Sequence, residues 1–219
     1  YYDIRNNSTV NDIDARFNWW GTTTTATMDA GSNPKDISKI YDYYDDNTLG
    51  TVNYAGWLSE AGGDPPATTM LGAVLLTNSS GTEQLNFAAD STLYIKVTDS
   101  DRNTNSGTAE TITVSASSET ETTAETVTLT ETGANTGIFM GSITFAEAAA
   151  SSGDGVLQVT RGDKLTGSYT DPADDYGNET TVTDVAFYAV TLTTGSLSSS
   201  TTWTAANSPY LVTGDVTIG

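Results

Sequence analysis

The stretch at residues 92–116, TLYIKVTDSDRNTNSGTAETITVSA, places an apolar, alternating segment on each side of a polar loop. The apolar residues of the two segments stand at every second position: Leu93, Ile95, Val97, Ile112 and Val114. Side chains of a β-strand point alternately to its two faces, so this spacing predicts two strands that each bury one face.

The same alternation recurs through the rest of this region. Further strands are expected at residues 125–131, 137–145, 155–159, 164–170 and 184–192. They are short and rich in Thr, and turn residues separate them, which is typical of an Ig-like antiparallel β-sandwich. The chain is therefore predicted to be all-β, and residues 33–46, NPKDISKIYDYYDD, are the one candidate for a helical turn or two.

Composition excludes several classes of function. The chain has no Cys and no His, which removes Cys and His catalysis and the usual zinc, haem and iron–sulfur ligand sets. Twenty-eight Asp and Glu face eight Lys and Arg, for a net charge of −20, so nucleic acid and anionic membrane surfaces are poor partners. Such a charge favours solubility at a cell surface, divalent cation binding, or both. No apolar run is long enough to insert into a membrane, and we expect no enzymatic activity.

The loop after the first strand resembles a cation-binding loop. Oxygen-bearing side chains occupy positions 1, 3, 5, 7 and 12 of twelve, as in an EF-hand: Asp99, Asp101, Asn103, Asn105 and Glu110. Three departures weaken the match, because Thr104 replaces the usual Gly, position 7 normally offers a backbone carbonyl, and the flanks are strands. The alternative is a hydrated loop with Asx turns. We predict calcium here.

A second acidic segment, YTDPADDYGNET at residues 169–180, supplies Asp171, Asp174 and Asp175. It is either an acidic surface turn or a second source of metal ligands. If the strands ending in LYIKVTD and LTGSYTD finish at the same end of the sandwich, their loops can share ions. By contrast, Asp42, Asp45 and Asp46 are expected to solvate the surface, and the RGD at 161–163 to form an ordinary turn.

The two ends of the chain resemble parts of right-handed parallel β-helices from prokaryotic cell-surface proteins. Residues 15–58, with ARFNWWGT near their start and NYAGWL at their end, resemble the closing coil of such a helix. The resemblance implies that bulky aromatic side chains cover its end, and the candidates are Trp19, Trp20, Tyr54 and Trp57. Residues 201–219, TTWTAANSPYLVTGDVTIG, resemble an opening coil, with apolar positions at Val212, Val216 and Ile218.

The middle of the chain resembles an Ig-like domain repeated in archaeal and bacterial S-layer and surface proteins. The resemblance covers most of residues 85–190, and TLTETGANTGIFMG at 128–141 is its most specific part. Domains of this family are structural modules that often carry calcium. The expected organisation is a β-helix coil at 1–60, a linker at 61–84, the Ig-like sandwich at 85–195, and a hinge with an opening β-helix strand at 196–219.

These features together predict a calcium-stabilised structural subunit of an extracellular filament or surface layer of a bacterium or archaeon. Its partners would be copies of itself joined head to tail, with the terminal β-helix strand donated to a neighbour. One alternative is an adhesin or carbohydrate-binding stalk module, and another is an excised repeat of a larger protein. Glycans are expected at Asn-X-Ser/Thr sequences: Asn6, Asn7, Asn78 and Asn178.

Overall fold

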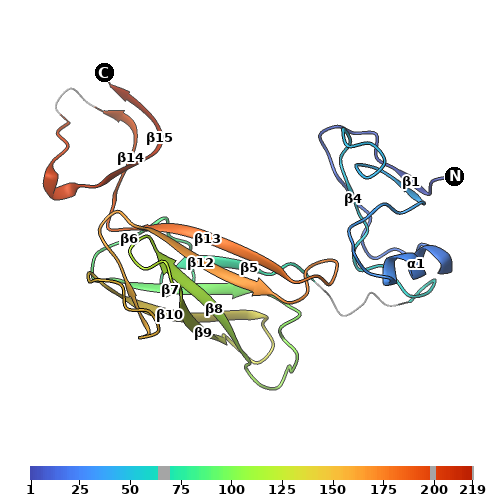
Figure 1. Ribbon diagram of the computed structural model, residues 1–219, viewed down its shortest axis with the longest axis horizontal. Helices are drawn as coiled ribbons and strands as arrows, with labels where there is room; N and C mark the ends of the chain where they lie inside the picture. The colour runs from blue at the N-terminus through green and yellow to red at the C-terminus, as the bar shows by residue number, and fades with distance from the viewer. Residues whose placement is uncertain (64–69, 198–200, 219) are drawn as a thin grey trace. The chain divides into compact units, whose positions relative to one another are not determined.

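The computed structural model describes residues 1–63, 70–197 and 201–218 (Figure 1). The described residues are mainly β, with one large sheet, three two-stranded sheets and one short α-helix. Contacts divide the chain into two compact units. The first comprises Tyr1–Leu71 and Asp171–Thr180, and the second comprises Gly72–Thr170 and Thr181–Gly219. The domain limits proposed from sequence stay predictions, and part of the expected linker lies outside the described residues.

The large sheet has nine strands and is mostly antiparallel. Its strands are β5 (Ala73–Thr77), β6 (Asn86–Phe87), β7 (Thr92–Thr98), β8 (Thr111–Ser118), β9 (Glu125–Glu131), β10 (Ile138–Ala146), β11 (Val156–Gln158), β12 (Lys164–Asp171) and β13 (Thr180–Tyr188). They lie in the order β5-β7-β10-β9-β8-β12-β13-β6, with β11 parallel to β10. The predicted mainly-β, largely antiparallel character of this region is confirmed.

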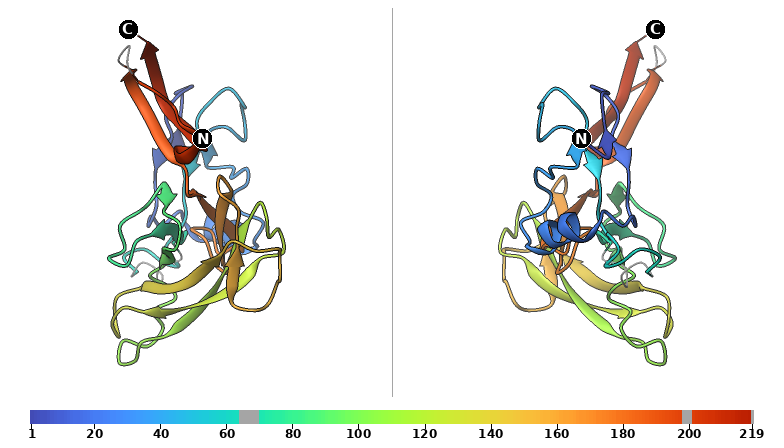
Figure 2. Two further views of the ribbon diagram at one scale, coloured as in Figure 1. Left: turned by 90° about the vertical axis from the view of Figure 1, so that its left-hand side faces the viewer. Right: turned by 90° about the vertical axis from the view of Figure 1, so that its right-hand side faces the viewer.

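One continuous hydrogen-bonded sheet stands where the sequence suggested a two-layer sandwich. Strand β10 is long enough to pair with β7 along one edge and with β9 along the other, and this joins both halves of the sheet. The sheet curls into a half-barrel around its own core (Figures 1 and 2). Strand β5, which falls inside the expected linker, pairs with β7.

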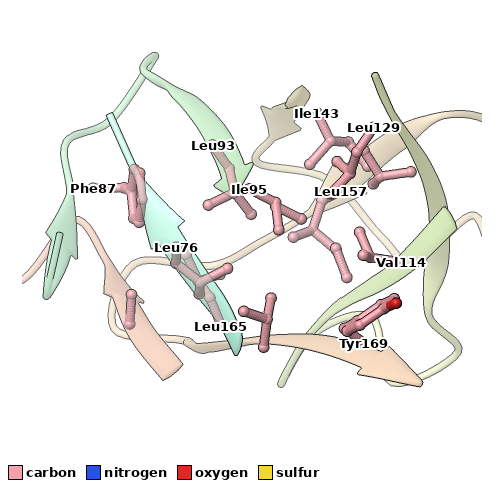
Figure 3. Packing of buried hydrophobic residues seen from close by; sticks show 14 of the residues in the cluster. Leu76, Phe87, Leu93, Ile95, Val114, Leu129, Ile143, Leu157, Leu165 and Tyr169 are labelled. Carbon is pink, nitrogen blue, oxygen red and sulfur yellow. The ribbon is translucent and has the colours of Figure 1, made fainter. Parts of the chain in front are cut away.

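Period-two alternation places the core of this sheet on its inner face. Every second residue of β7 is buried, as the spacing of Leu93, Ile95 and Val97 predicts. Figure 3 shows Ile95, Leu129 and Leu157 among the side chains gathered from different strands into one cluster. Burying these apolar surfaces is the main favourable contribution to folding of the sheet.

The inward face of β9 begins and ends with a carboxylate. Its buried residues alternate as Glu125, Val127, Leu129 and Glu131. Both glutamates accept backbone N–H bonds: Glu125 from Gly153 and Gly155, and Glu131 from Thr136 and Gly137. Burial alone would raise the pKa of Glu131, but these N–H groups outweigh it and hold that pKa below its usual value.

The first unit is built on two short parallel pairs. Strand β1 (Ile4–Arg5) pairs with β3 (Ile40–Tyr41), and β2 (Ile13–Asp14) pairs with β4 (Val52–Asn53). Parallel pairs return the chain to the same direction after a long excursion, and each pair here spans more than thirty residues of sequence. Between them lies a second core: Ala15, Trp20, Met28, Ile37, Ile40, Val52 and Tyr54.

The one α-helix of the described residues lies at Thr22–Asp29 (α1), and the expected helical turns at 33–46 are not α-helix. Five threonines make α1 a weak helix by propensity. Its last carbonyls are stabilised from outside: the Lys35 ammonium donates to Thr27 and Gly31, and the Asn33 amide donates to Met28. Tertiary contacts therefore override local preference, and the sequence prediction is wrong about the helix's position.

The last strands form a separate parallel pair within the second unit. Strand β14 (Thr191–Leu197) lies beside β15 (Tyr210–Ile218), and a 3₁₀ turn at Ala205–Asn207 stands between them in sequence (Figure 2). The register shifts between Thr193 and Gly195. The rings of Trp203 and Tyr210 stack with their centroids 4.7 Å apart. No strand pairs with the outer edge of β15 among the described residues.

Truncating a central core side chain tests the placement of the core. We expect Leu129→Ala to lower the free energy of unfolding of the second unit by about 2–5 kcal/mol, because it removes buried methyl groups and leaves a cavity. Leu85→Ala is the matched control, since that leucine is exposed. Urea unfolding measures both variants, and equal losses would contradict the described core.

Candidate metal centre

Three carboxylates meet at one end of the large sheet. Asp99 follows β7 directly, Asp101 lies two residues further on, and Asp171 is the last residue of β12. One oxygen from each lies within 4.8 Å of the other two. Asp99 is 2% exposed, Asp171 is fully buried, and Asp101 is partly buried. We call these three residues the carboxylate cluster, and its donor set suits a metal ion.

Hydrogen bonds orient the side chains of the cluster. The hydroxyl of Tyr169 donates to Asp99 Oδ2 at 2.6 Å. The backbone N–H of Ala173 donates to Asp171 Oδ1 at 2.9 Å, which forms an Asx turn. These bonds orient the carboxylates of Asp99 and Asp171.

The turn between β9 and β10 packs against the start of the 99–110 loop. The N–H of Asp99 donates to the carbonyl of Gly137 at 2.8 Å. Gly137 has a φ of +60°, and a Cβ there would lie 2.9 Å from Ser100 Cα and 3.0 Å from the Asp99 carbonyl oxygen. Only glycine fits this approach without displacing the backbone that carries Asp99.

The cluster gathers three carboxylates at a largely buried site. Carboxylates this close repel one another, and burial removes the water that would screen them. A bound divalent cation removes both costs, which is why the arrangement suits a metal.

The remaining predicted ligands of the 99–110 loop lie outside the cluster. Asn105 turns back on its own loop and accepts the N–H of Gly107. Asn103 donates to Asn135, and Glu110 accepts the hydroxyl of Thr104. The second oxygens, Asn103 Oδ1 and Glu110 Oε2, are buried and accept no hydrogen bond from the described residues. The loop thus adopts an arrangement other than the twelve-residue EF-hand pattern.

The other predicted acidic ligands, Asp174 and Asp175, accept hydrogen bonds elsewhere. Asp174 accepts the N–H groups of Tyr176 and Asn178 and the hydroxyl of Thr180. Asp175 accepts the N–H of Leu71. Neither belongs to the carboxylate cluster.

Two further acidic motifs have structural partners. Asp42 is buried and accepts the N–H groups of Tyr44 and Val52, so it holds the start of β4 rather than simply solvating the surface. Asp163 of the RGD sequence is also buried and accepts the N–H groups of Thr120 and Thr160. In the turn expected at residues 161–163, the side chain of Asp163 therefore points into the protein.

The aromatic candidates of the first unit divide by burial. Trp20 and Tyr54 lie in its core, Trp57 packs against that core, and Trp19 is exposed. Tyr54 donates to Asn33 Oδ1, and burial raises its pKa to about 12. In the last strand, Val212 is exposed and Val216 is partly buried, while the side chain of Ile218 lies outside the described residues.

The glycosylation candidates differ in the freedom of their amides. Asn6 is buried and its amide nitrogen donates to two backbone carbonyls, and that of Asn178 donates to Asn33. A glycan on either nitrogen would have to break these bonds. Asn7 is exposed and Asn78 partly exposed, so they are the more accessible acceptors.

No protein-family model matches the chain, and a search of curated proteins finds no match. In the described part of the chain, no helix has the length and apolar character needed to cross a membrane. The assignment of the carboxylate cluster as a candidate metal site therefore depends on the positions of its side chains.

Removing cations should destabilise the large sheet through the cluster. After chelation, we expect an added divalent cation at a hundredfold excess over its Kd to raise Tm by about 5–10 °C, because it binds only the folded state. Asp171→Asn should abolish most of that shift. Asp174→Asn, which removes the same charge outside the cluster, should keep it. A Tm indifferent to both cation and chelator would contradict the site.

Proposed function

We propose that this chain is a structural subunit of an extracellular filament or surface layer of a bacterium or archaeon, which assembles head to tail and is stabilised by calcium. The observation that carries the proposal is the presence of small parallel strand pairs near both ends of the chain. Such pairs flank a curled antiparallel sheet, which we interpret as the Ig-like module.

The parallel pair of β14 and β15 has the spacing of stacked coils. Thr191 pairs with Tyr210 and Gly195 with Val216, so about twenty residues separate neighbouring strands, as in a β-solenoid. In the first unit, two consecutive short strands pair with the next two in the same order, which is the pattern of two successive coils. These features support partial β-helix coils at the two ends.

Two-stranded sheets are marginal by themselves, and a free parallel edge recruits another chain. Strand β15 offers such an edge, and the exposed apolar side chains of Leu192 and Val212 lie on this pair. We propose that the first unit of a second copy pairs with the free edge of β15, because that unit carries matching parallel coils. Joining one end to a different end is heterologous, and it propagates unless it closes into a ring.

Calcium is compatible with the cluster. Two oxygens bound to one Ca²⁺ at about 2.4 Å can lie up to about 4.8 Å apart, and the oxygens of the cluster lie within that separation. Calcium also takes six to eight oxygens. The unoccupied Asn103 Oδ1 and Glu110 Oε2 of the same loop are additional candidate ligands.

A charge placed on β15 tests the assembly. We expect Val212→Asp to abolish filaments or layers seen by electron microscopy, because an uncompensated carboxylate would be buried at the junction. Val185→Asp is the matched control, since that valine is comparably exposed but lies on β13 of the large sheet. Assembly by the Val212→Asp protein, or a wild-type chain that stays monomeric at high concentration with calcium, would refute strand addition.

Terbium luminescence tests the cation. Tb³⁺ resembles Ca²⁺ in size and ligand preference, and Tyr169 lies within hydrogen-bonding distance of Asp99, where it can sensitise emission. We expect Ca²⁺ to displace Tb³⁺ far more effectively than Mg²⁺ does. Asp171→Asn should abolish the signal, whereas Tyr169→Phe should dim it without abolishing binding. Equal competition by both ions would argue against a calcium site.

A further inference from the structure

The first unit contains a pocket of about 500 Å³, and all of its lining residues belong to that unit. The size falls within the range of small-molecule sites. Aromatic and hydrogen-bonding side chains meet there: Asp12, Asp14, Arg16, Tyr44, Asn53 and Tyr176.

One of the two carboxylates in the pocket is paired with its guanidinium. Arg16 forms a two-pronged ion pair with Asp14, with Nε–Oδ1 at 3.0 Å and Nη2–Oδ2 at 2.9 Å. These bonds lower the pKa of Asp14 to about 2, so the pair stays ionised at neutral pH. Asp12 accepts both the N–H and the hydroxyl of Thr51. A single, already paired guanidinium beside two carboxylates is a poor site for an anion.

Two neutral phenol rings line the same space. The Tyr176 hydroxyl donates to Asn53 Oδ1 at 3.1 Å, and its ring packs edge-on against Tyr54 with centroids 5.3 Å apart. Tyr44 also lines the pocket and is 38% exposed. Burial raises the pKa of both Tyr44 and Tyr176, which keeps the rings uncharged.

Asn53 leaves a donor group available to a ligand. Its Oδ1 accepts the Tyr176 hydroxyl and the N–H of Ala55, while its amide nitrogen donates to none of the described residues. The pocket therefore combines a donating amide, accepting carboxylates and aromatic rings. Hydroxyl groups both donate and accept, so a polyhydroxylated ligand can satisfy all of these groups together.

We propose that this pocket binds a neutral saccharide. The apolar C–H face of a sugar ring packs on an aromatic side chain, and its hydroxyls pair with planar amide and carboxylate groups. A cationic ligand would gain less, because Arg16 already neutralises Asp14. The proposal is independent of strand addition: a chain that stays monomeric would still bind sugar.

Saturation-transfer NMR on the full chain tests the proposal with glucose, galactose, mannose and N-acetylglucosamine as probes. We expect at least one of them to bind with a Kd on the order of millimolar. Tyr44→Ala should weaken that binding roughly tenfold, because it removes a stacking surface. Tyr43→Ala is the matched control, because Tyr43 is next to Tyr44 in sequence and 46% exposed but does not line the pocket.

Charged sugars and the wild-type spectrum complete the test. Glucuronic acid or glucosamine binding more tightly than every neutral probe would overturn the neutral-saccharide assignment. In the wild-type protein, the ring signals of Tyr44 and Tyr176 should shift during titration, which tests the site even if Tyr44→Ala does not fold. No binding by any neutral probe, or equal loss in the Tyr43→Ala protein, would also overturn the proposal.

Discussion

A carboxylate at the rim of an apolar core must find a donor or a cation, and much of this fold is arranged around that requirement. The inner face of β9 carries a glutamate at each end, and both are held by backbone N–H groups of neighbouring turns. Asp42 and Asp163 use the same solution elsewhere. At the Asp99, Asp101 and Asp171 end, N–H and hydroxyl donors orient Asp99 and Asp171, and the three carboxylates lie close enough together to hold a metal ion.

The sequence predicts the strands of the large sheet well because their pattern is locally encoded. Strands β7 and β8 have apolar residues at alternate positions, as β9 has at Val127 and Leu129, and burial of one face follows directly. Hydrogen bonds between strands join residues far apart in sequence. The spacing of apolar residues therefore does not predict that β10 joins both halves into one sheet. Helix α1 was missed because Lys35 and Asn33, beyond its end, supply its stabilising bonds.

The candidate site was predictable in part for the same reason. Asp99 and Asp101 are predicted as ligands from the loop spacing, whereas Asp171 joins them only if LYIKVTD and LTGSYTD end at the same end of the domain, which the sequence does not determine. The EF-hand spacing did not determine the rest, because loop conformation places Asn105 on its own backbone and Asp174 in a turn. Tyr169 was missed, although its inward position two residues before Asp171 is a signal that sequence reasoning can use.

The way buried carboxylates are held has a consequence for the behaviour of the protein in concentrated salt. Ion pairs weaken as ionic strength rises, but a carboxylate held by backbone N–H groups depends on short, fixed dipoles that mobile ions screen little. Ion pairs such as Arg16–Asp14 and Lys39–Asp3 occur among the described residues, whereas the surplus acidic side chains repel one another across the surface. Added salt therefore screens more repulsion than attraction. High salt concentrations, which destabilise proteins that depend on ion pairs, should increase the stability of this fold.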